Sequence, residues 1–207
     1  YDSDGEELPL DNFLLNEDGR VIYLRVPNGP EGEKLISLKG VDQLEALEIL
    51  KVYNHEISDL KPLSKLKNIR GLKLTKNKIS DASYLQGLSK LEFLDLGYNP
   101  LKTTHFFNGL TSLKSLDCHV CKIQSLKGME VMKSLQFIDI DAGGVVSIEA
   151  IRDLDALRRV HVNVGNVVDF SPLAGKLKLE YLRVKGGKGK DLSFLKTLTN
   201  LREFYLS

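Results

Sequence analysis

Two cysteines and a histidine stand close together in the middle of the 207-residue chain. Cys118 and Cys121 form a C-x-x-C pattern, which is typical of thiol redox centres and of one half of a zinc site. The zinc site would be incomplete, because the chain has no second C-x-x-C and no closely spaced pair of histidines. Free cysteine is among the most buried residue types. We therefore predict that both thiols are buried and structural, and we expect no metal and no cofactor.

Carboxylates and imidazoles recur in the same region at intervals of 22 residues: Asp95, Asp117, His119, Asp139, Asp141 and His161. A carboxylate beside an imidazole is suited to acid–base chemistry or to a pH-sensitive contact, and several carboxylates suit a hard cation. No nucleophile or oxyanion-binding motif accompanies these residues. A hydrolase or a cation site is therefore the least favoured hypothesis, and we predict no enzymatic activity.

The interval of 22 residues belongs to a repeat that runs through most of the chain. The pattern apolar-x-x-apolar-x-apolar starts at Leu47 and recurs at Ile69, Leu91, Leu113, Leu135, Leu157, Leu179 and Leu201. An earlier unit of 26 residues starts at Val21, with its extra length in the loop-forming sequence PNGPEGEK. The alternation predicts a short strand with one apolar face, which is buried only when successive units stack.

The rest of each unit carries apolar residues at its eleventh and seventeenth positions, as in Ile57 and Leu63. Proline and the lack of long helical faces predict short helical or 3-10 turns there. The ninth position holds His55, Asn77, Asn99 and Cys121 in the first units, and glycine at 143, 165 and 187. Glycine lacks the side-chain bonds of asparagine, so we expect a looser or differently curved second half.

Units such as LEALEILKVYNHEISDLKPLSK and IRGLKLTKNKISDASYLQGLSK resemble the 22-residue class of leucine-rich repeats, as found in bacterial internalins and in a protein-phosphatase regulatory subunit. The resemblance covers residues 21–207. It implies an α/β leucine-rich-repeat solenoid, with a curved parallel sheet on the concave face and short helical or 3-10 turns on the convex face. It also implies a protein-interaction scaffold. The internalin-like repeat favours a secreted or surface protein of a bacterium, whereas the phosphatase-regulator likeness favours the cell interior.

The two ends of the array differ. Asp18-Gly19 between two apolar runs is a hairpin signal, and we interpret residues 1–20 as an N-terminal cap. Residues 21–207 then hold the 26-residue unit, seven 22-residue units and a partial unit from Leu201. The chain ends one strand into that partial unit. We expect either a longer natural chain or a partner chain or domain that covers this strand.

The outward positions of the predicted strands carry the candidate binding residues. Along the sheet they run from basic to acidic and aromatic, then back to basic, although the net charge is only +1. This balance predicts no nucleic-acid binding, and no apolar run is long enough for a membrane span. We predict a protein ligand on the concave face, with a structural spacer in a larger surface protein as the alternative. The predicted partner-binding residues are Tyr53, Phe93, Asp95, Tyr98, Asp117, His119, Phe137, Asp139, Asp141, Arg159, His161, Tyr181 and Arg183.

Overall fold

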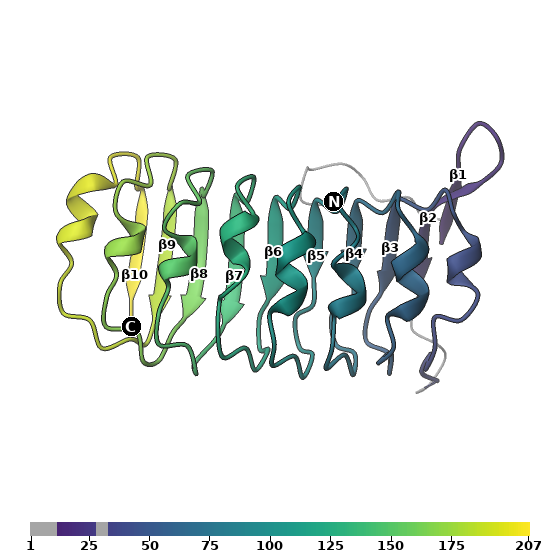
Figure 1. Cartoon of the computed structure of the whole chain (residues 1–207), viewed down its shortest axis with the longest axis horizontal. Coiled ribbons are helices and arrows are strands. Elements are labelled where there is room, and N and C mark those ends of the chain that lie inside the picture. Colours follow the sequence, from purple (N-terminus) through teal and green to yellow (C-terminus); the bar gives the residue numbers. More distant parts are fainter. Residues whose placement is uncertain (1–11, 28–32) are drawn as a thin grey trace.

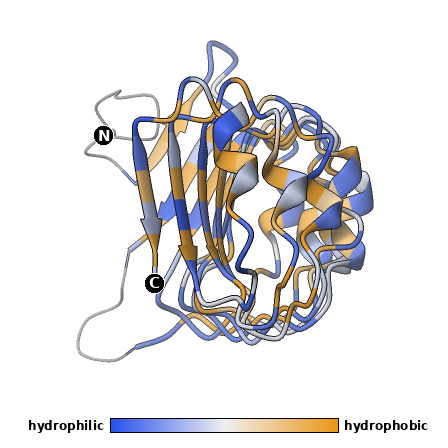
Figure 2. Ribbon diagram, turned by 90° about the vertical axis from the view of Figure 1, so that its left-hand side faces the viewer, coloured by the Kyte–Doolittle hydropathy of each residue, from blue (hydrophilic) through white to orange (hydrophobic). Residues whose placement is uncertain are grey.

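The computed structural model describes residues 12–27 and 33–207. Within these ranges ten strands form one sheet in chain order, and short 3-10 turns form a second layer behind it (Figures 1 and 2). The strands from β2 onward pair in parallel. The predicted α/β solenoid is therefore confirmed, with a curved sheet on the concave face and 3-10 turns on the convex face.

The strands are β1 Phe13–Leu15, β2 Val21–Val26, β3 Ile49–Val52, β4 Gly71–Lys73, β5 Phe93–Asp95, β6 Ser115–Cys118, β7 Phe137–Asp141, β8 Arg159–Asn163, β9 Tyr181–Lys185 and β10 Glu203–Leu206. The turns are η2 Val41–Gln43, η3 Lys61–Lys65, η4 Ser83–Leu85, η5 His105–Gly109, η6 Met129–Val131, η7 Glu149–Ile151, η8 Ser171–Leu173 and η9 Ser193–Thr197.

The register of the sheet follows the repeat. Leu50 lies opposite Leu72, which lies opposite Leu94, and all three side chains are almost fully buried. The apolar columns of the convex half are buried too, as Ile57 and Leu63 show. Because side chains alternate along a strand, a slip by one residue would move every core leucine to solvent. The repeat thus fixes which residues line the concave face.

An antiparallel hairpin precedes the parallel strands. β1 pairs with β2, and the turn between them has Gly19 at φ 73°. The side-chain oxygen of Asn16 accepts hydrogen bonds from the backbone amides of Asp18 and Arg20, which closes the turn. Residues 1–11 and 28–32 lie outside the described ranges, so part of the proposed cap and of the loop in the first unit does too. The division into a cap of residues 1–20 and repeats of residues 21–207 stays a prediction.

The ninth-position side chains form the predicted ladder in the first half. Asn77 Nδ2 donates to the carbonyls of Val52 and Leu74 at 2.8 and 2.9 Å, and its Oδ1 accepts from the amide of Ile57. Asn99 makes the same bonds one unit later. Cys121 takes the next place, and its Sγ donates to the carbonyl of Leu96 at 3.3 Å.

Both cysteines are buried and neither forms a disulfide, as their structural interpretation requires. A hydrogen bond to Cys121 and burial raise the pKa of the Cys118 thiol well above its usual value. The C-x-x-C pattern is therefore part of the core and ladder of this unit.

The units with glycine at the ninth position have longer strands than the units with asparagine there. Strands β7, β8 and β9 have five residues each, whereas β4 and β5 have three. The eighth residues of the first units, such as Lys76 and Tyr98, turn the chain with positive φ. The turns of the two halves thus differ in shape, and the expectation of a looser or differently curved second half stays a prediction. A Cβ on Gly165 would lie only 3.0 Å from the carbonyl oxygen of Gly143, so close backbone packing replaces the side-chain ladder.

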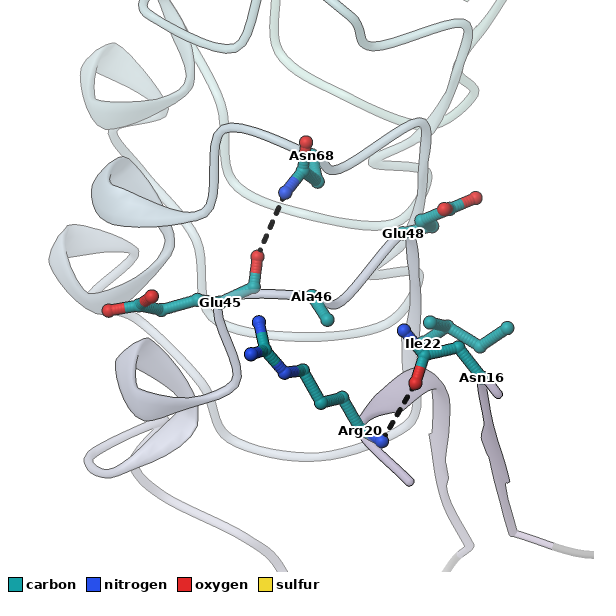
Figure 3. Close-up of a pocket in the computed structure, with 7 residues that line it drawn as sticks. All are labelled: Asn16, Arg20, Ile22, Glu45, Ala46, Glu48 and Asn68. Atoms are coloured by element: carbon teal, nitrogen blue, oxygen red, sulfur yellow. Dashed lines mark hydrogen bonds between the residues drawn. The ribbon is translucent and has the colours of Figure 1, made fainter. Parts of the chain in front are cut away.

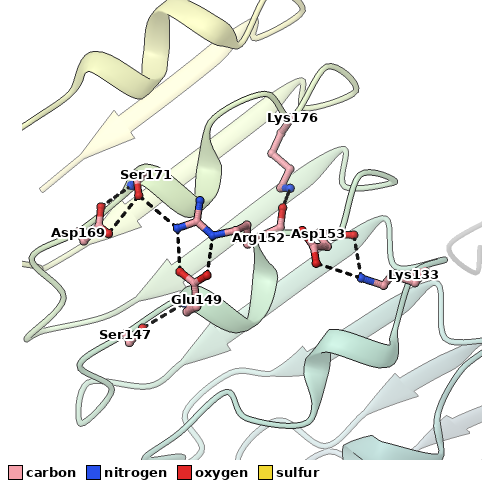
Figure 4. A network of polar contacts seen from close by, with 8 residues as sticks. All are labelled: Lys133, Ser147, Glu149, Arg152, Asp153, Asp169, Ser171 and Lys176. Carbon is pink, nitrogen blue, oxygen red and sulfur yellow. Dashed lines mark hydrogen bonds and ion pairs between the residues drawn. The ribbon is translucent and has the colours of Figure 1, made fainter.

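A polar network joins neighbouring units on the convex face (Figure 4). Arg152 donates to both carboxylate oxygens of Glu149 and reaches the hydroxyl of Ser171 in the next unit. Lys176 occupies a column that holds leucine or methionine in the other 22-residue units. Its side chain is only 1% exposed, and its ammonium donates to the carbonyl of Arg152 and to Asp155. This buried cation was not predicted from the sequence.

Candidate functional site

The thirteen predicted residues all lie on strands β3 to β9 or on the turns that follow them, and none is buried. Those on the strands alternate with the buried leucine columns, so they lie on the face of the sheet turned away from the 3-10 turns. All thirteen side chains are at least partly accessible. Their role in binding stays a prediction.

Six of these residues line one shallow hollow of about 310 Å³ over strands β6 to β9. They are Asp117, Phe137, Asp139, Arg159, His161 and Tyr181. Ser115, Leu116 and Ile138 complete the lining. The hollow therefore combines carboxylates, two aromatic rings, an imidazole and a guanidinium within one patch.

The carboxylate of Asp139 lies between two imidazoles. His161 Nδ1 is 3.1 Å from Asp139 Oδ2, and His119 Nδ1 is 3.5 Å from Asp139 Oδ1. The Oδ1 atom is itself buried and has no hydrogen-bond partner, so the longer contact counts as an ion pair only when His119 is protonated. The rings of His119 and His161 are 6.1 Å apart. The charge at this point of the hollow therefore depends on the protonation of two histidines.

Asp117 lies in the same hollow. Burial raises the pKa of its carboxyl, and the nearby charges of Asp95 and Asp139 raise it further. The amide of His119 donates to Asp117 Oδ1 at 2.8 Å and partly opposes this shift. Asp117 is thus a carboxylate held in an unfavourable environment, which a cationic group from outside would relieve.

Asp95 is more fully engaged within the protein. Its carboxylate accepts from the amide of Gly97 at 3.0 Å and from the hydroxyl of Thr75 at 2.6 Å. Asp95 and Asp117 each accept a hydrogen bond from the backbone amide two residues later in the chain. This role in the turn was not predicted from the sequence. Aspartate followed by a turn is the signal that would have indicated it.

The opposite rim of the hollow is aromatic and basic. The Arg159 guanidinium carbon lies 5.1 Å from the centre of the Tyr181 ring, within cation–π range. The Tyr181 ring is 5.8 Å from that of Tyr205 on β10, which extends the aromatic surface. Tyr205 was not among the predicted site residues, although it follows Arg183 in the outward series that begins with Arg25.

The other predicted residues lie outside the hollow. Tyr98 packs edge-on against His119 at 5.6 Å, and Asp141 accepts from Asn163 at 2.8 Å. Phe93 stands between Gly71 and Ser115 in the sheet register. Arg183 pairs with His161 in the register, and Tyr53 accepts a hydrogen bond from Arg25 at the far end of the face.

A second hollow, of about 400 Å³, lies beside the N-terminal hairpin (Figure 3). Asn16 and Asn68 in its lining serve the local backbone, the first by closing the hairpin turn and the second by donating to the carbonyl of Glu45. It contains none of the predicted partner-binding residues. The hollow over β6 to β9 is the stronger candidate site.

Neither a cluster of metal ligands nor a membrane-spanning helix occurs in the part of the chain that the structure describes. No three His, Cys, Asp or Glu side chains are grouped there so that they could hold a metal ion. No helix in that part has the length and apolar composition needed to cross a membrane. Within the same ranges no hydroxyl or thiol is hydrogen-bonded to the imidazole of His119 or His161.

No protein-family model and no curated protein sequence matches the chain. Solved structures do. Internalin C2 from Listeria monocytogenes is 26% identical, with a TM-score of 0.81 over 84% of this chain and 77% of that protein. A leucine-rich-repeat protein from Leptospira interrogans is 21% identical, with a TM-score of 0.59 over 81% of this chain and 50% of that protein.

A plant protein has the same fold. The leucine-rich-repeat ectodomain of the membrane receptor kinase GASSHO1/SCHENGEN3 from Arabidopsis thaliana, in complex with CASPARIAN STRIP INTEGRITY FACTOR 2, is 18% identical. Its TM-score is 0.73, over 92% of this chain and 28% of the ectodomain. The Leptospira and plant likenesses show the fold alone, and this chain spans half or less of either protein.

Proposed function

We propose that this leucine-rich-repeat protein of internalin type is a non-enzymatic binding module that takes a protein partner on its concave face. The similar structures are leucine-rich-repeat proteins, among them an internalin and a receptor ectodomain in complex with another factor. This fold is one of protein–protein interaction. The internalin likeness also supports a secreted or surface location for the chain.

The observation that carries the proposal is the composition of the hollow over β6 to β9. Phe137 is 37% exposed and Tyr181 is half-buried, so apolar ring surface is open to a partner. Aromatic and arginine side chains dominate the binding energy of many protein interfaces. Asp117 and Asp139 lie beside these rings. A lysine or arginine side chain of a partner would place its charge on the carboxylates and its apolar stem along Phe137.

The same hollow argues against an enzyme. A shallow depression on an open sheet excludes water poorly, and catalysis by charge stabilisation depends on a site that excludes water. The described carboxylate–imidazole pairs lack an adjacent nucleophile. A binding role uses the carboxylates and rings of the hollow, whereas a hydrolytic role would need a hydroxyl or thiol bonded to an imidazole.

Affinity capture with the purified domain, followed by titration of the captured protein, tests this proposal. We expect the double substitution Asp117→Lys and Asp139→Lys to weaken binding roughly tenfold or more, because it reverses the charge that faces the partner. Asp153→Lys on the convex face is the matched control, since its carboxylate is 76% exposed and forms a surface ion pair with Lys133. Unchanged affinity of the double variant would reject this placement and favour the spacer hypothesis.

A further inference from the structure

A basic cluster occupies the other end of the concave face, away from the hollow. Arg25, Lys51 and Lys73 lie opposite one another on β2, β3 and β4. Like charges directly opposite one another across a sheet are destabilising. The nearest carboxylate in the same column, Asp95, already accepts bonds from Thr75 and from the amide of Gly97.

Two tyrosine rings lie among these cations. The Lys51 ammonium is 5.4 Å from the centre of the Tyr23 ring. Lys73 and Arg25 are 5.6 and 5.9 Å from the centre of the Tyr53 ring. The Tyr53 hydroxyl accepts from Arg25 Nη2 at 2.9 Å, which fixes the guanidinium on the face. These cation–π contacts keep the Lys73 and Arg25 charges beside the same ring.

Two donor groups of this cluster are buried and have no acceptor. Tyr23 is only 4% exposed, and its hydroxyl has no hydrogen-bond partner. The Nε atom of Arg25 is buried and also has none. Burial raises the pKa of Tyr23, with Arg25 opposing the shift, so the phenol remains a donor at neutral pH. Buried polar groups are nearly always paired with protein, water or ligand, and two unpaired donors beside cations indicate a missing acceptor.

We propose that Tyr23, Arg25, Tyr53 and Lys73 form a binding site for an oxyanion, that is, for a carboxylate, sulfate or phosphate group. The planar guanidinium suits two oxygens of such a group, and its Nε donor is unused. The Tyr23 hydroxyl supplies a further donor, and the exposed Lys73 ammonium supplies charge at the surface. The site is separate from the hollow, whose carboxylates select cations.

The consequence is a face that recognises opposite charges at its two ends. The oxyanion site lies on β2 to β4, and the acidic hollow lies on β6 to β9. A partner that spans both would present an anionic group to the first and a cationic group to the second. This polarity would fix the direction in which a partner lies along the sheet.

The Nε–H resonance of Arg25 in a nitrogen–proton correlation spectrum of the whole chain tests the site. We expect a saturable shift on titration with sodium sulfate, and none with sodium chloride at equal ionic strength. Sodium phosphate and sodium acetate are the further arms. Saturation by acetate as well would identify a carboxylate-type site, and saturation by the tetrahedral anions alone a sulfate or phosphate site. An equal, non-saturating response to every salt, chloride included, would overturn the proposal.

Two substitutions assign the site to its donors. Tyr23→Phe removes only the hydroxyl, and we expect roughly tenfold weaker sulfate binding, as for a hydrogen bond to a charged group. If that variant does not keep the wild-type spectrum, Arg25→Gln read on the Tyr53 ring resonances replaces it. Lys61→Gln on η3 is the control. Wild-type affinity in the first two variants would overturn the assignment. The titration uses small free anions, so its outcome is independent of the partner proposed for the hollow.

Discussion

Asp139 and His161 form the closest side-chain pair in the hollow, with His161 Nδ1 3.1 Å from Asp139 Oδ2 across strands β7 and β8. The two residues are direct neighbours in the sheet register. Aspartate at this position continues a series of three, and histidine ends it. The pair therefore marks the place where the series of carboxylates meets an imidazole.

A double-mutant cycle with Asp139→Asn and His161→Gln measures this contact. We expect a coupling free energy of about 0.2–1 kcal/mol, because the pair is partly exposed. Urea unfolding of the four proteins provides the measurement. A coupling free energy of zero would contradict a stabilising contact between the two side chains.

Asp117 gives a second prediction, about stability. Burial raises the pKa of its folded-state carboxyl, and the charges of Asp95 and Asp139 raise it further. A raised carboxyl pKa means that the folded state binds the proton more tightly than the unfolded state. The resulting stabilisation is present below the unfolded pKa and is lost as the pH rises through the folded pKa.

Near pH 7 the Asp117→Asn variant should therefore be more stable than wild type and unfold at a higher urea concentration. The gain in unfolding free energy should be less than about 1 kcal/mol, because the carboxylate is partly solvated. Asparagine keeps an oxygen that accepts from the amide of His119, so the turn is preserved. The difference should shrink as the pH falls toward about 4. Asp153→Asn on the convex face is the control. A variant less stable than wild type at neutral pH would show that the carboxylate, rather than its oxygen alone, holds this turn.

Much of the fold was predictable because the solenoid translates a linear repeat directly into space. Once Leu50, Leu72 and Leu94 are recognised as equivalent, their register, their burial and the outward position of the residues between them follow. The ladder residues Asn77 and Asn99 were predictable for the same reason.

The site was predictable only in part. The repeat places Asp117, Phe137 and Tyr181 on one face, but the hollow that joins them depends on side-chain lengths and on curvature. The unpaired hydroxyl of Tyr23 had no signal in the sequence, because its position in the repeat is outward whereas its side chain is buried. Lys176 was missed for the opposite reason, since a long side chain let a charged residue occupy an apolar column.

Lys176 supplies a third prediction. Its ammonium is buried and pairs with Asp155, a carboxylate that is 84% exposed and so offers weak compensation. Replacing a buried ion pair with apolar residues of similar size is often neutral or stabilising. Lys176→Met should therefore raise the free energy of unfolding by roughly 1–3 kcal/mol. Lys178→Met, at an exposed position nearby, is the control for loss of charge. A less stable Lys176→Met protein would show that the bond to the carbonyl of Arg152 outweighs the cost of burying the charge.

Cys121 supplies the fourth prediction, because it interrupts the ladder. In the preceding units the ninth-position side chain accepts from the amide twenty residues earlier, as Asn99 accepts from the amide of Ile79. Cys121 instead donates to the carbonyl of Leu96 and accepts a hydrogen bond from the Cys118 thiol. Cys121→Asn should restore an acceptor for the amide of Leu101 and add a second carbonyl contact. We expect an increase in unfolding free energy of about 1 kcal/mol.

Cys121→Ala is the matched control, and it should be less stable than wild type because it removes the sulfur donor and leaves the carbonyl of Leu96 without it. Thermal unfolding of the three proteins under reducing conditions gives the order Asn, Cys, Ala. The same experiment separates a ladder role from a redox role, since thiol chemistry predicts no gain from asparagine.

In the native wild-type protein, Cys118 and Cys121 should resist a thiol reagent that labels both after denaturation, because neither is more than 6% exposed. Rapid labelling of the folded protein, or an Asn variant less stable than the Ala variant, would contradict a structural ladder at this position.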